Sequence, residues 1–232
     1  MARQRIAELD FLRGACLLVM IICHLAWDLH MYYGYPAYYR QGWLHWAFMV
    51  LAPVFMVLAG ISSSFSRSHG KRAARVLFFA MAITLFTFFY DREQVILFGI
   101  LHFMGVNMLL YPYYRRLNPW LLTGIALVVI SLGRTVAGMD LPTDLLLPLG
   151  FRSAAYRSLD YFPMIPYAGF FMFGTVLGPL LYPRGKPRLV LNLPPNPLSY
   201  LGQHSLTVYV LHQPVLVSVL FVLNALGIIR GQ

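Results

Sequence analysis

Charged residues are scarce in this sequence. They make up 11% of its 232 residues, whereas hydrophobic residues make up 59%. Soluble domains carry about 25% charged residues, so this chain lacks the charge needed to cover a water-facing surface. The composition therefore excludes an ordinary soluble domain and indicates a protein that faces lipid over most of its area.

Cysteine is almost absent. Cys16 and Cys23 lie two turns apart on one predicted helix, which separates their Cα atoms by ~10 Å at 1.5 Å per residue. A disulfide requires less than about 7 Å. We therefore expect two free thiols that pack as small apolar side chains.

Acidic residues are also few, since eight Asp and Glu stand against 18 Lys and Arg and give a formal net charge of +10. In a soluble protein this imbalance would point to nucleic acid. Here the basic residues lie in short clusters between apolar runs, as in the cytoplasmic loops of membrane proteins. The chain has neither a glycine-rich RNA-binding signature nor zinc-ligand spacing, so we expect no nucleic-acid partner and no metal.

Long apolar segments are abundant. A helix needs ~20 mainly apolar residues to cross a bilayer, and seven segments fit, of which the last is long enough to be broken at Pro214. A further short helix fits between Ala137 and Tyr156. The prediction is an all-α polytopic membrane bundle that residues 1–232 form as one domain. The predicted spans run Leu9–Leu29, Leu44–Phe65, Val76–Tyr90, Val95–Tyr113, Trp120–Gly133, Tyr161–Tyr182 and Leu198–Ile228.

Basic residues set the expected orientation. Eleven Lys and Arg lie in the loops on the N-terminal side of the membrane and six in the loops on the other side. The positive-inside rule then places the N-terminus in the cytoplasm and, with seven spans, the C-terminus outside. Charged residues interrupt the approach to the first apolar run and no small-residue cleavage site follows it, so we expect that run to be retained as a helix. The expected location is the bacterial inner membrane.

The first span carries a polar stripe. At 100° per residue, Asp10, Arg13, His24 and Asp28 fall within ~60° on one helix face. A charged residue at mid-bilayer costs at least ~2.5–3.5 kcal/mol, so this face must meet protein or water. In a structural interpretation, Asp10 pairs with Arg13 and His24 hydrogen-bonds a neighbouring helix.

A functional interpretation of the stripe rests on depth. Arg13 lies near the cytoplasmic mouth and His24 lies ~16 Å further in. This order suits a ligand with an anionic head and a reactive tail, such as a coenzyme A thioester. The imidazole of His24 would act as general base or nucleophile near neutral pH.

Five short blocks resemble, in their order and spacing, the heparan-alpha-glucosaminide N-acetyltransferase catalytic-domain family in its compact bacterial form. The Arg13–His24 spacing is also similar to that of the acyltransferase-3 family. The resemblance implies acetyl-CoA or a related donor and a saccharide acceptor. Lysosomal members place the catalytic histidine in or after the first outer loop, which makes His30 the alternative to His24. The blocks are Glu8–Gly14 with His24, Phe98–His102, Leu159–Pro163, Leu201–Ser205 and Leu211–Pro214.

Two further histidines lie at depths similar to that of His24, namely His102 in the fourth span and His212 in the last. We expect the three imidazoles to converge around a thioester carbonyl and an acceptor. A break at Pro214 would free the carbonyl of Val210 and line a cavity. In the alternative interpretation, His102 only bonds between helices and Pro214 only kinks its helix.

Three other residues have open or purely structural interpretations. His204, at the start of the last helix, would cap it, contact the donor's head or anchor it at the interface. Asp160 would cap the sixth span or form an acceptor-side carboxylate. His69, among basic loop residues, is expected to be solvated.

The sequence thus predicts a transmembrane enzyme that moves an acyl group, first of all acetyl, from cytoplasmic acyl-CoA to a sugar or glycolipid on the other side. It leaves open direct transfer or an acyl-histidine, and a monomer or an oligomer. The rivals are a small transporter or flippase with a histidine proton relay, and a non-catalytic scaffold. The assigned residues are His24, His102, His212 and Asp28 for catalysis, Asp10, Arg13, His204 and Arg72 for the donor, and His30, Asp160 and Gln213 for the acceptor.

Overall fold

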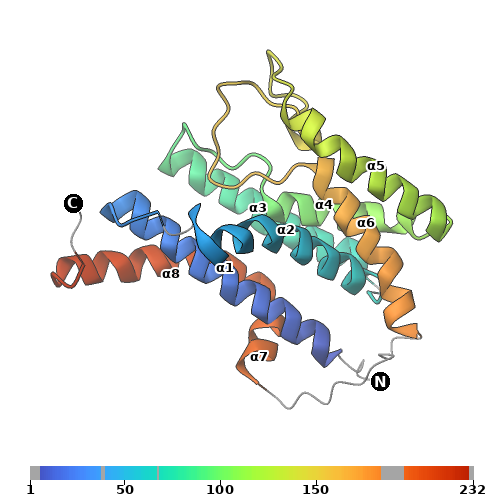
Figure 1. Cartoon of the computed structure of the whole chain (residues 1–232), viewed down its shortest axis with the longest axis horizontal. Coiled ribbons are helices and arrows are strands. Elements are labelled where there is room, and N and C mark those ends of the chain that lie inside the picture. The colour runs from blue at the N-terminus through green and yellow to red at the C-terminus, as the bar shows by residue number, and fades with distance from the viewer. Residues whose placement is uncertain (1–5, 38–39, 67, 184–195, 230–232) are drawn as a thin grey trace. The chain divides into compact units, whose positions relative to one another are not determined.

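The structure is a computed structural model that describes residues 6–37, 40–66, 68–183 and 196–229. Within these ranges it is all-helical, apart from one isolated bridge between Asp140 and Arg152. Figure 1 shows the helices in chain order. They are α1 (Ala7–Tyr33), α2 (Gly42–Ser63), α3 (His69–Tyr90), α4 (Ile100–Tyr114), α5 (Pro119–Ala137), α6 (Met164–Leu181), α7 (Pro197–Gln203) and α8 (Ser205–Ala225), with a 3-10 turn, η2 (Leu147–Leu149).

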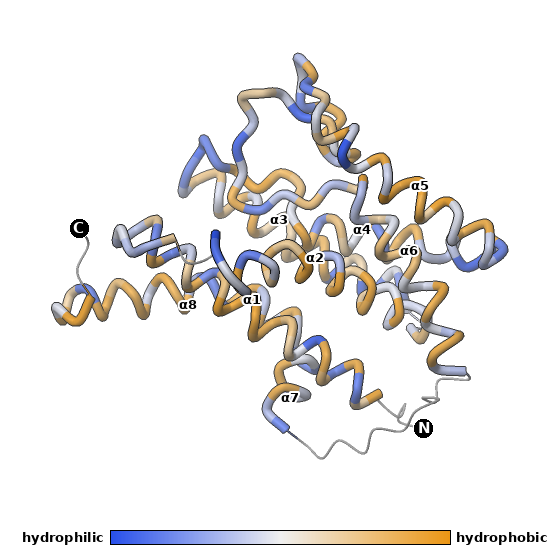
Figure 2. The backbone as a smooth tube through the Cα atoms, viewed as in Figure 1, coloured by the Kyte–Doolittle hydropathy of each residue, from blue (hydrophilic) through white to orange (hydrophobic). Residues whose placement is uncertain are grey.

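The long helices have the length and composition of membrane spans. Among the described residues, six helices qualify, namely α1, α2, α3, α5, α6 and α8. Figure 2 shows their predominantly hydrophobic residues, with hydrophilic ones gathered near helix ends and in loops. This confirms the predicted polytopic helical membrane bundle. The predicted fourth span corresponds to α4, which has 15 residues and is shorter than the ~20 that cross a bilayer, so the count of seven stays a prediction.

The chain forms two compact units. Unit 1 comprises residues 1–55 and 189–232, and unit 2 comprises residues 56–188. The helix α2 begins in unit 1 and ends in unit 2. Whether the two units act as one domain, as the sequence predicts, stays a prediction. The predicted orientation, with the N-terminus in the cytoplasm, also stays a prediction. Part of the count of basic residues on which it rests lies outside the described ranges, namely Arg3, Arg5, Arg67, Arg184, Lys186, Arg188 and Arg230.

Unit 1 is held together by a close approach of two helix backbones. A Cβ atom on Gly14 of α1 would lie 1.7 Å from the carbonyl oxygen of Leu198 on α7, and one on Gly202 of α7 would lie 1.7 Å from the carbonyl oxygen of Asp10. Only glycine permits such contact. The pair of glycines therefore sets the short helix α7 directly against the first turns of α1.

The last predicted span is broken at His204, and the prediction of a break at Pro214 was wrong. His204 has φ −107° and ψ 25° between α7 and α8, whereas α8 continues through Pro214. Proline removes one backbone donor, and the rest of the helix tolerates this loss. The packing of α7 against α1 ends the first segment, so tertiary contact and not proline chemistry places the break.

Unit 2 packs α3 against α4 and α5 against α6. Gly169 of α6 lies against the carbonyl of Ala126 on α5, and Gly174 lies against the backbone of Val57 on α2. Small residues thus let three helices approach closely, as is common between membrane helices. The short helix expected between Ala137 and Tyr156 is the single turn η2.

Both cysteines are free, as predicted. Cys23 is 1% exposed, and Cys16 is half-buried on the same helix α1. They pack as small apolar side chains.

Candidate functional site

Two histidines that the sequence placed at similar depth meet in unit 1. His24 lies on α1 and His212 lies on α8. Their rings stand edge to face with centroids 4.9 Å apart and an interplanar angle of 80°. The expected approach of this pair of imidazoles is therefore present.

A carboxylate and an amide complete this group. Asp28 follows His24 by one turn of α1, and Gln213 follows His212 on α8. The Gln213 amide nitrogen donates a hydrogen bond of 2.8 Å to Asp28 Oδ1, and Asp28 is completely buried. We refer to His24, Asp28, His212 and Gln213 as the histidine–carboxylate cluster.

Backbone hydrogen bonds fix the tautomer of both imidazoles. Nδ1 of His24 lies 2.9 Å from the carbonyl oxygen of Met20, and Nδ1 of His212 lies 2.6 Å from that of Tyr209. A carbonyl oxygen only accepts, so each Nδ1 carries a proton and donates it. The neutral form of each ring therefore keeps its lone pair on Nε2.

The cluster contains three buried polar atoms that have no hydrogen-bond partner among the described residues. They are Oδ2 of Asp28, Nε2 of His212 and Oε1 of Gln213. His212 Nε2 in the tautomer above and the Gln213 carbonyl oxygen are acceptors, and so is Asp28 Oδ2 when the carboxyl group is ionised. A buried polar atom left unpaired costs ~1–3 kcal/mol, and several together indicate a site that a ligand with N–H or O–H groups would complete. The arrangement can accept a proton from such a ligand.

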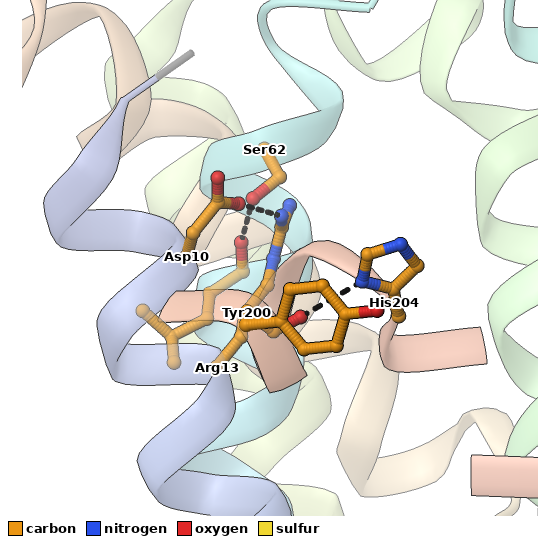
Figure 3. A network of polar contacts seen from close by, with 6 residues as sticks. Asp10, Arg13, Ser62, Tyr200 and His204 are labelled. Carbon is orange, nitrogen blue, oxygen red and sulfur yellow. Dashed lines mark hydrogen bonds and ion pairs between the residues drawn. The ribbon is translucent and has the colours of Figure 1, made fainter. Parts of the chain in front are cut away.

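The other end of the polar stripe is an ion pair. Arg13 Nη1 lies 3.3 Å from Asp10 Oδ1, and the two side chains are 20% and 9% exposed. Figure 3 shows Arg13 turned towards Asp10. The ion pair that the structural interpretation expected between Asp10 and Arg13 is thus observed. Glu8, only 7% exposed, adds a second carboxylate to this end of α1, so Arg13 does not make it positive.

His204 lies at the junction of α7 and α8. Its Nδ1 donates a hydrogen bond of 3.0 Å to the carbonyl oxygen of Tyr200, and the two rings lie 4.4 Å apart (Figure 3). The side chain therefore caps the C-terminal end of α7. The sequence had placed it at the start of the last helix. Its ring is exposed and available to a ligand.

His30 closes the C-terminal end of α1. Its Nδ1 donates to the carbonyl oxygen of Tyr35 over 2.7 Å, next to Gly34 with φ 71°. His30 follows His24 by six residues, which is a rotation of about 240° around the helix. It therefore points to a different face of α1 from the histidine–carboxylate cluster.

His102 uses both ring nitrogens within unit 2. Nδ1 accepts from the backbone N–H of Gly99 over 3.2 Å, so Nε2 carries the proton and donates it to Thr84 Oγ1 over 3.2 Å. Thr84 in turn donates to the carbonyl oxygen of Ile96 over 2.6 Å. The ring joins α3 to α4, as the structural interpretation predicted. Its predicted meeting with His24 and His212 spans both units and stays a prediction.

Asp160 caps a helix, but not the predicted one. Its Oδ2 accepts a hydrogen bond of 3.0 Å from the backbone N–H of Ile100, the first residue of α4. The expectation that it caps the sixth span was wrong, because α6 begins at Met164 after Pro163. The chain folds Asp160 back onto α4, and a Cβ at Gly99 would lie 2.3 Å from its Oδ2. A side chain at position 99 would therefore displace the Asp160 carboxylate from this cap.

The loop that precedes α6 presents neutral hydroxyl groups. Burial, and secondarily the neighbouring Tyr156, raises the pKa of Tyr161 to about 12, and the Tyr161 hydroxyl donates to the carbonyl oxygen of Leu147 over 2.8 Å. Burial also raises the pKa of Tyr156. Both phenols stay protonated at neutral pH.

His69 in unit 2 has surroundings that differ from the sequence prediction. His69 was expected to be solvated, but its ring stacks on Tyr111 at 4.4 Å and both ring nitrogens are buried. That expectation was wrong because α3 begins at His69, seven residues before the predicted start, and brings the ring against α4. Arg72, predicted to bind the donor, lies on the same first turns of α3.

No group of three or more His, Cys, Asp or Glu side chains that could hold a metal ion occurs in the part of the chain that the structure describes.

These features define a polytopic membrane protein with a partly buried histidine–carboxylate cluster between its first and last helices. The family model described as heparan-alpha-glucosaminide N-acetyltransferase, catalytic, matches residues 5–214, and the chain belongs to this family. The matched segment contains the whole cluster. No curated protein and no solved structure matches the chain. The resemblance predicted from the sequence is confirmed, and the protein is an integral membrane protein of an acetyltransferase family.

Proposed function

We propose that the protein transfers an acetyl group from acetyl-CoA in the cytoplasm to a sugar or glycolipid on the other side of the membrane. The histidine–carboxylate cluster carries this proposal, because it places two basic nitrogens and a carboxylate together in a member of this family. The bacterial inner membrane is the proposed location, and the saccharide acceptor follows from the family description.

The proposed reaction uses His24 as general base. The nucleophilic nitrogen or oxygen of the acceptor attacks the thioester carbonyl carbon, and His24 Nε2 takes the proton that the acceptor loses. The carbon–sulfur bond then breaks, and the leaving thiolate takes up a proton. The Nδ1–H of His24, bound to the Met20 carbonyl, holds the ring with its lone pair on Nε2.

His212 and Asp28 support this base. An imidazolium at His24 next to the His212 ring and the Asp28 carboxylate would be stabilised by the carboxylate's charge. Gln213 holds one oxygen of Asp28 in place and leaves its own carbonyl as an acceptor for a substrate N–H or O–H. We assign catalysis to His24, His212 and Asp28, and acceptor binding to Gln213.

The remaining predicted residues receive positioning or entry roles. His102 has both nitrogens engaged, so we assign it to the frame between α3 and α4, which Asp160 also anchors. His204, exposed at the junction of α7 and α8, is assigned to the donor's entry. Asp10 and Arg13 are also assigned to the donor's entry, where Arg13 forms an ion pair with Asp10. His30 stays the alternative base.

One observation favours a second candidate, a proton-coupled transporter. Two imidazoles in contact and a buried carboxylate also form a chain of proton acceptors across neighbouring helices. Such a protein would move a solute or protons without consuming a thioester.

A purified-protein assay separates the two functions. The protein in lipid nanodiscs is incubated with acetyl-CoA labelled on the acetyl group and with a panel of amino sugars, neutral sugars and glycolipids. We expect acceptor-dependent release of free thiol and label transfer to one acceptor class. Absence of both thioester consumption and coenzyme A binding, together with proton uptake by proteoliposomes, would reject the transferase.

A further inference from the structure

The loop between α5 and α6 in unit 2 exposes leucine side chains at its tip. It leaves α5 after Ala137 and reaches α6 at Met164 (Figure 1). Leu145 is 85% exposed, and Leu146 and Leu149 are also exposed. We refer to Leu145, Leu146 and Leu149 as the leucine tip. Large apolar side chains gathered on one exposed turn mark a surface that meets another apolar surface.

Hydrogen bonds hold the tip in this conformation. The backbone N–H of Leu141 donates to the carbonyl oxygen of Arg152 over 3.0 Å. Asp144 accepts from the backbone N–H of Ser153 over 2.7 Å and from its hydroxyl over 3.2 Å. These bonds close the loop at its base, on both sides of the leucine tip. The exposure of the leucines is therefore a property of a folded turn.

A buried leucine docks the same turn on unit 2. Leu147 is 2% exposed, and its carbonyl oxygen accepts a hydrogen bond of 2.8 Å from the Tyr161 hydroxyl. Gly150 has φ 126°, and a Cβ there would lie 2.9 Å from the side chain of Val136 on α5. This glycine lets the turn η2 lie closely against the end of α5. The turn thus buries one leucine and leaves the leucine tip uncovered.

The length of α5 places the loop near the membrane surface. α5 has 19 residues, which is ~29 Å at 1.5 Å per residue, and the hydrocarbon core is about 30 Å thick. A helix of this length ends close to the boundary of the core. Leu127 and Leu132 are exposed on α5, and so is Met139, two residues after its end. The exposed apolar side chains thus continue from the membrane span onto the loop.

The side-chain chemistry of the tip favours lipid over a protein partner. Hot spots of protein interfaces are enriched in tryptophan, tyrosine and arginine, whereas leucine is under-represented there. All three side chains of the leucine tip are aliphatic, as lipid tails are. The bilayer is also the apolar surface that lies beside the end of a membrane span.

We propose that the leucine tip inserts into the interfacial layer of the bilayer, in the leaflet where α5 ends. The leucines leave water for the boundary between headgroups and acyl chains, which the hydrophobic effect favours. The insertion holds the loop that carries Tyr161 and Asp160, and Asp160 caps α4. The leucine tip contains no residue of the histidine–carboxylate cluster, and its role stands whether or not the transfer reaction proposed above is right.

The test uses the full-length protein in phosphatidylcholine nanodiscs, with both native cysteines replaced by alanine. Leu145→Cys and Leu149→Cys report on the tip. Ala155→Cys, at an exposed position of the same loop, is the control for water, and Leu127→Cys on α5 is the control for lipid. The first measurement is the rate at which each cysteine reacts with a charged thiosulfonate reagent. The second is the quenching of a fluorophore on that cysteine by nitroxide-labelled lipid.

We expect Leu145→Cys and Leu149→Cys to react at least ~10-fold more slowly than Ala155→Cys, because charged reagents and thiolates are both disfavoured in the interface. Labelled lipid should quench their fluorophores as it quenches the one on Leu127→Cys. Reaction as fast as that of Ala155→Cys would overturn the proposal and place the tip in water. Slow reaction without lipid quenching would overturn it too, since protein would then cover the tip. Equal melting temperatures show that the variants fold, and Leu146→Cys replaces either tip variant that does not.

Discussion

The amide of Gln213 donates a hydrogen bond to the carboxylate of Asp28 over 2.8 Å and joins α8 to α1 across 185 positions of the sequence. Asp28 is completely buried, and its second oxygen has no partner among the described residues. One carboxylate oxygen is thereby held, while the other stays available next to two imidazoles. This relationship makes the two ends of the chain act as one site.

Gln213→Ala should reduce both stability and turnover. It leaves a buried carboxylate without its donor, which costs ~1–3 kcal/mol, and it frees Asp28 to move. Thermal unfolding in nanodiscs measures the first effect, and acetyl transfer measures the second. The control is Gln203→Ala, an exposed glutamine at the end of α7. If Gln213→Ala matched the wild type in both measurements, the hydrogen bond would have no role.

His24→Ala should lower turnover at least ~100-fold, as the loss of a general base does. His212→Ala should lower it by about tenfold, since the base then loses its neighbour but keeps its own lone pair. Single-turnover transfer with labelled acetyl-CoA measures both. His45→Ala, an exposed histidine of α2, is the control. Full activity in His24→Ala together with an inactive His30→Ala would pass the role to His30.

Arg13→Ala should weaken coenzyme A binding by about tenfold, if Arg13 contacts a donor phosphate. Asp10→Asn should not weaken it, because this change releases the guanidinium from its 3.3 Å ion pair. Calorimetry with coenzyme A measures both affinities, and His24→Ala should bind like the wild type. Unchanged affinity in Arg13→Ala, with a lower melting temperature in both ion-pair variants, would make the pair purely structural.

Gly202→Ala should destabilise the protein. Its Cβ would lie 1.7 Å from the carbonyl oxygen of Asp10, so α7 must move away from α1, and such overpacking costs ~1–3 kcal/mol or more. Gly124→Ala is the matched control, because this glycine of α5 has no atom within 4 Å of its Cβ position. In a helix that change gains up to ~1 kcal/mol. Equal melting temperatures for the two variants would contradict the backbone contact.

Reporter fusions test the orientation and the number of spans. The charge bias predicts cytoplasmic reporters after Arg75 and Arg116, and external reporters after Arg92 and at the C-terminus. The reporters at Arg92 and Arg116 flank α4. Since α4 has only 15 residues, reporters on the same side at these two positions would show that it does not cross the membrane.

The sequence could predict the elements of the fold because their causes are local. The lack of charge and the long apolar runs require helices in lipid, where each backbone polar group must be satisfied within its own segment. The helical period alone placed Asp10, Arg13, His24 and Asp28 on one face, and the ion pair between Asp10 and Arg13 three residues apart follows from that period.

Other parts of the site depend on which helices meet. His24 contacts His212, and Asp28 accepts a hydrogen bond from Gln213, only because α8 packs along α1. Likewise Asp160 caps α4 instead of the helix that follows it in sequence.

The sequence by itself determined the class of protein, because its composition requires helices in lipid. Through the 3.6-residue period it also determined that Asp10, Arg13, His24 and Asp28 share one helix face. The tertiary structure alone decided that the last span breaks at His204 and not at Pro214, and that the His69 ring stacks on Tyr111. The physical reason is that a helix end or a buried ring is set by the surface that packs against it. The contact of Gly202 with the backbone of Asp10 joins segments far apart in the chain. The stack of His69 on Tyr111 depends on how α3 packs against α4, and no local pattern records either contact.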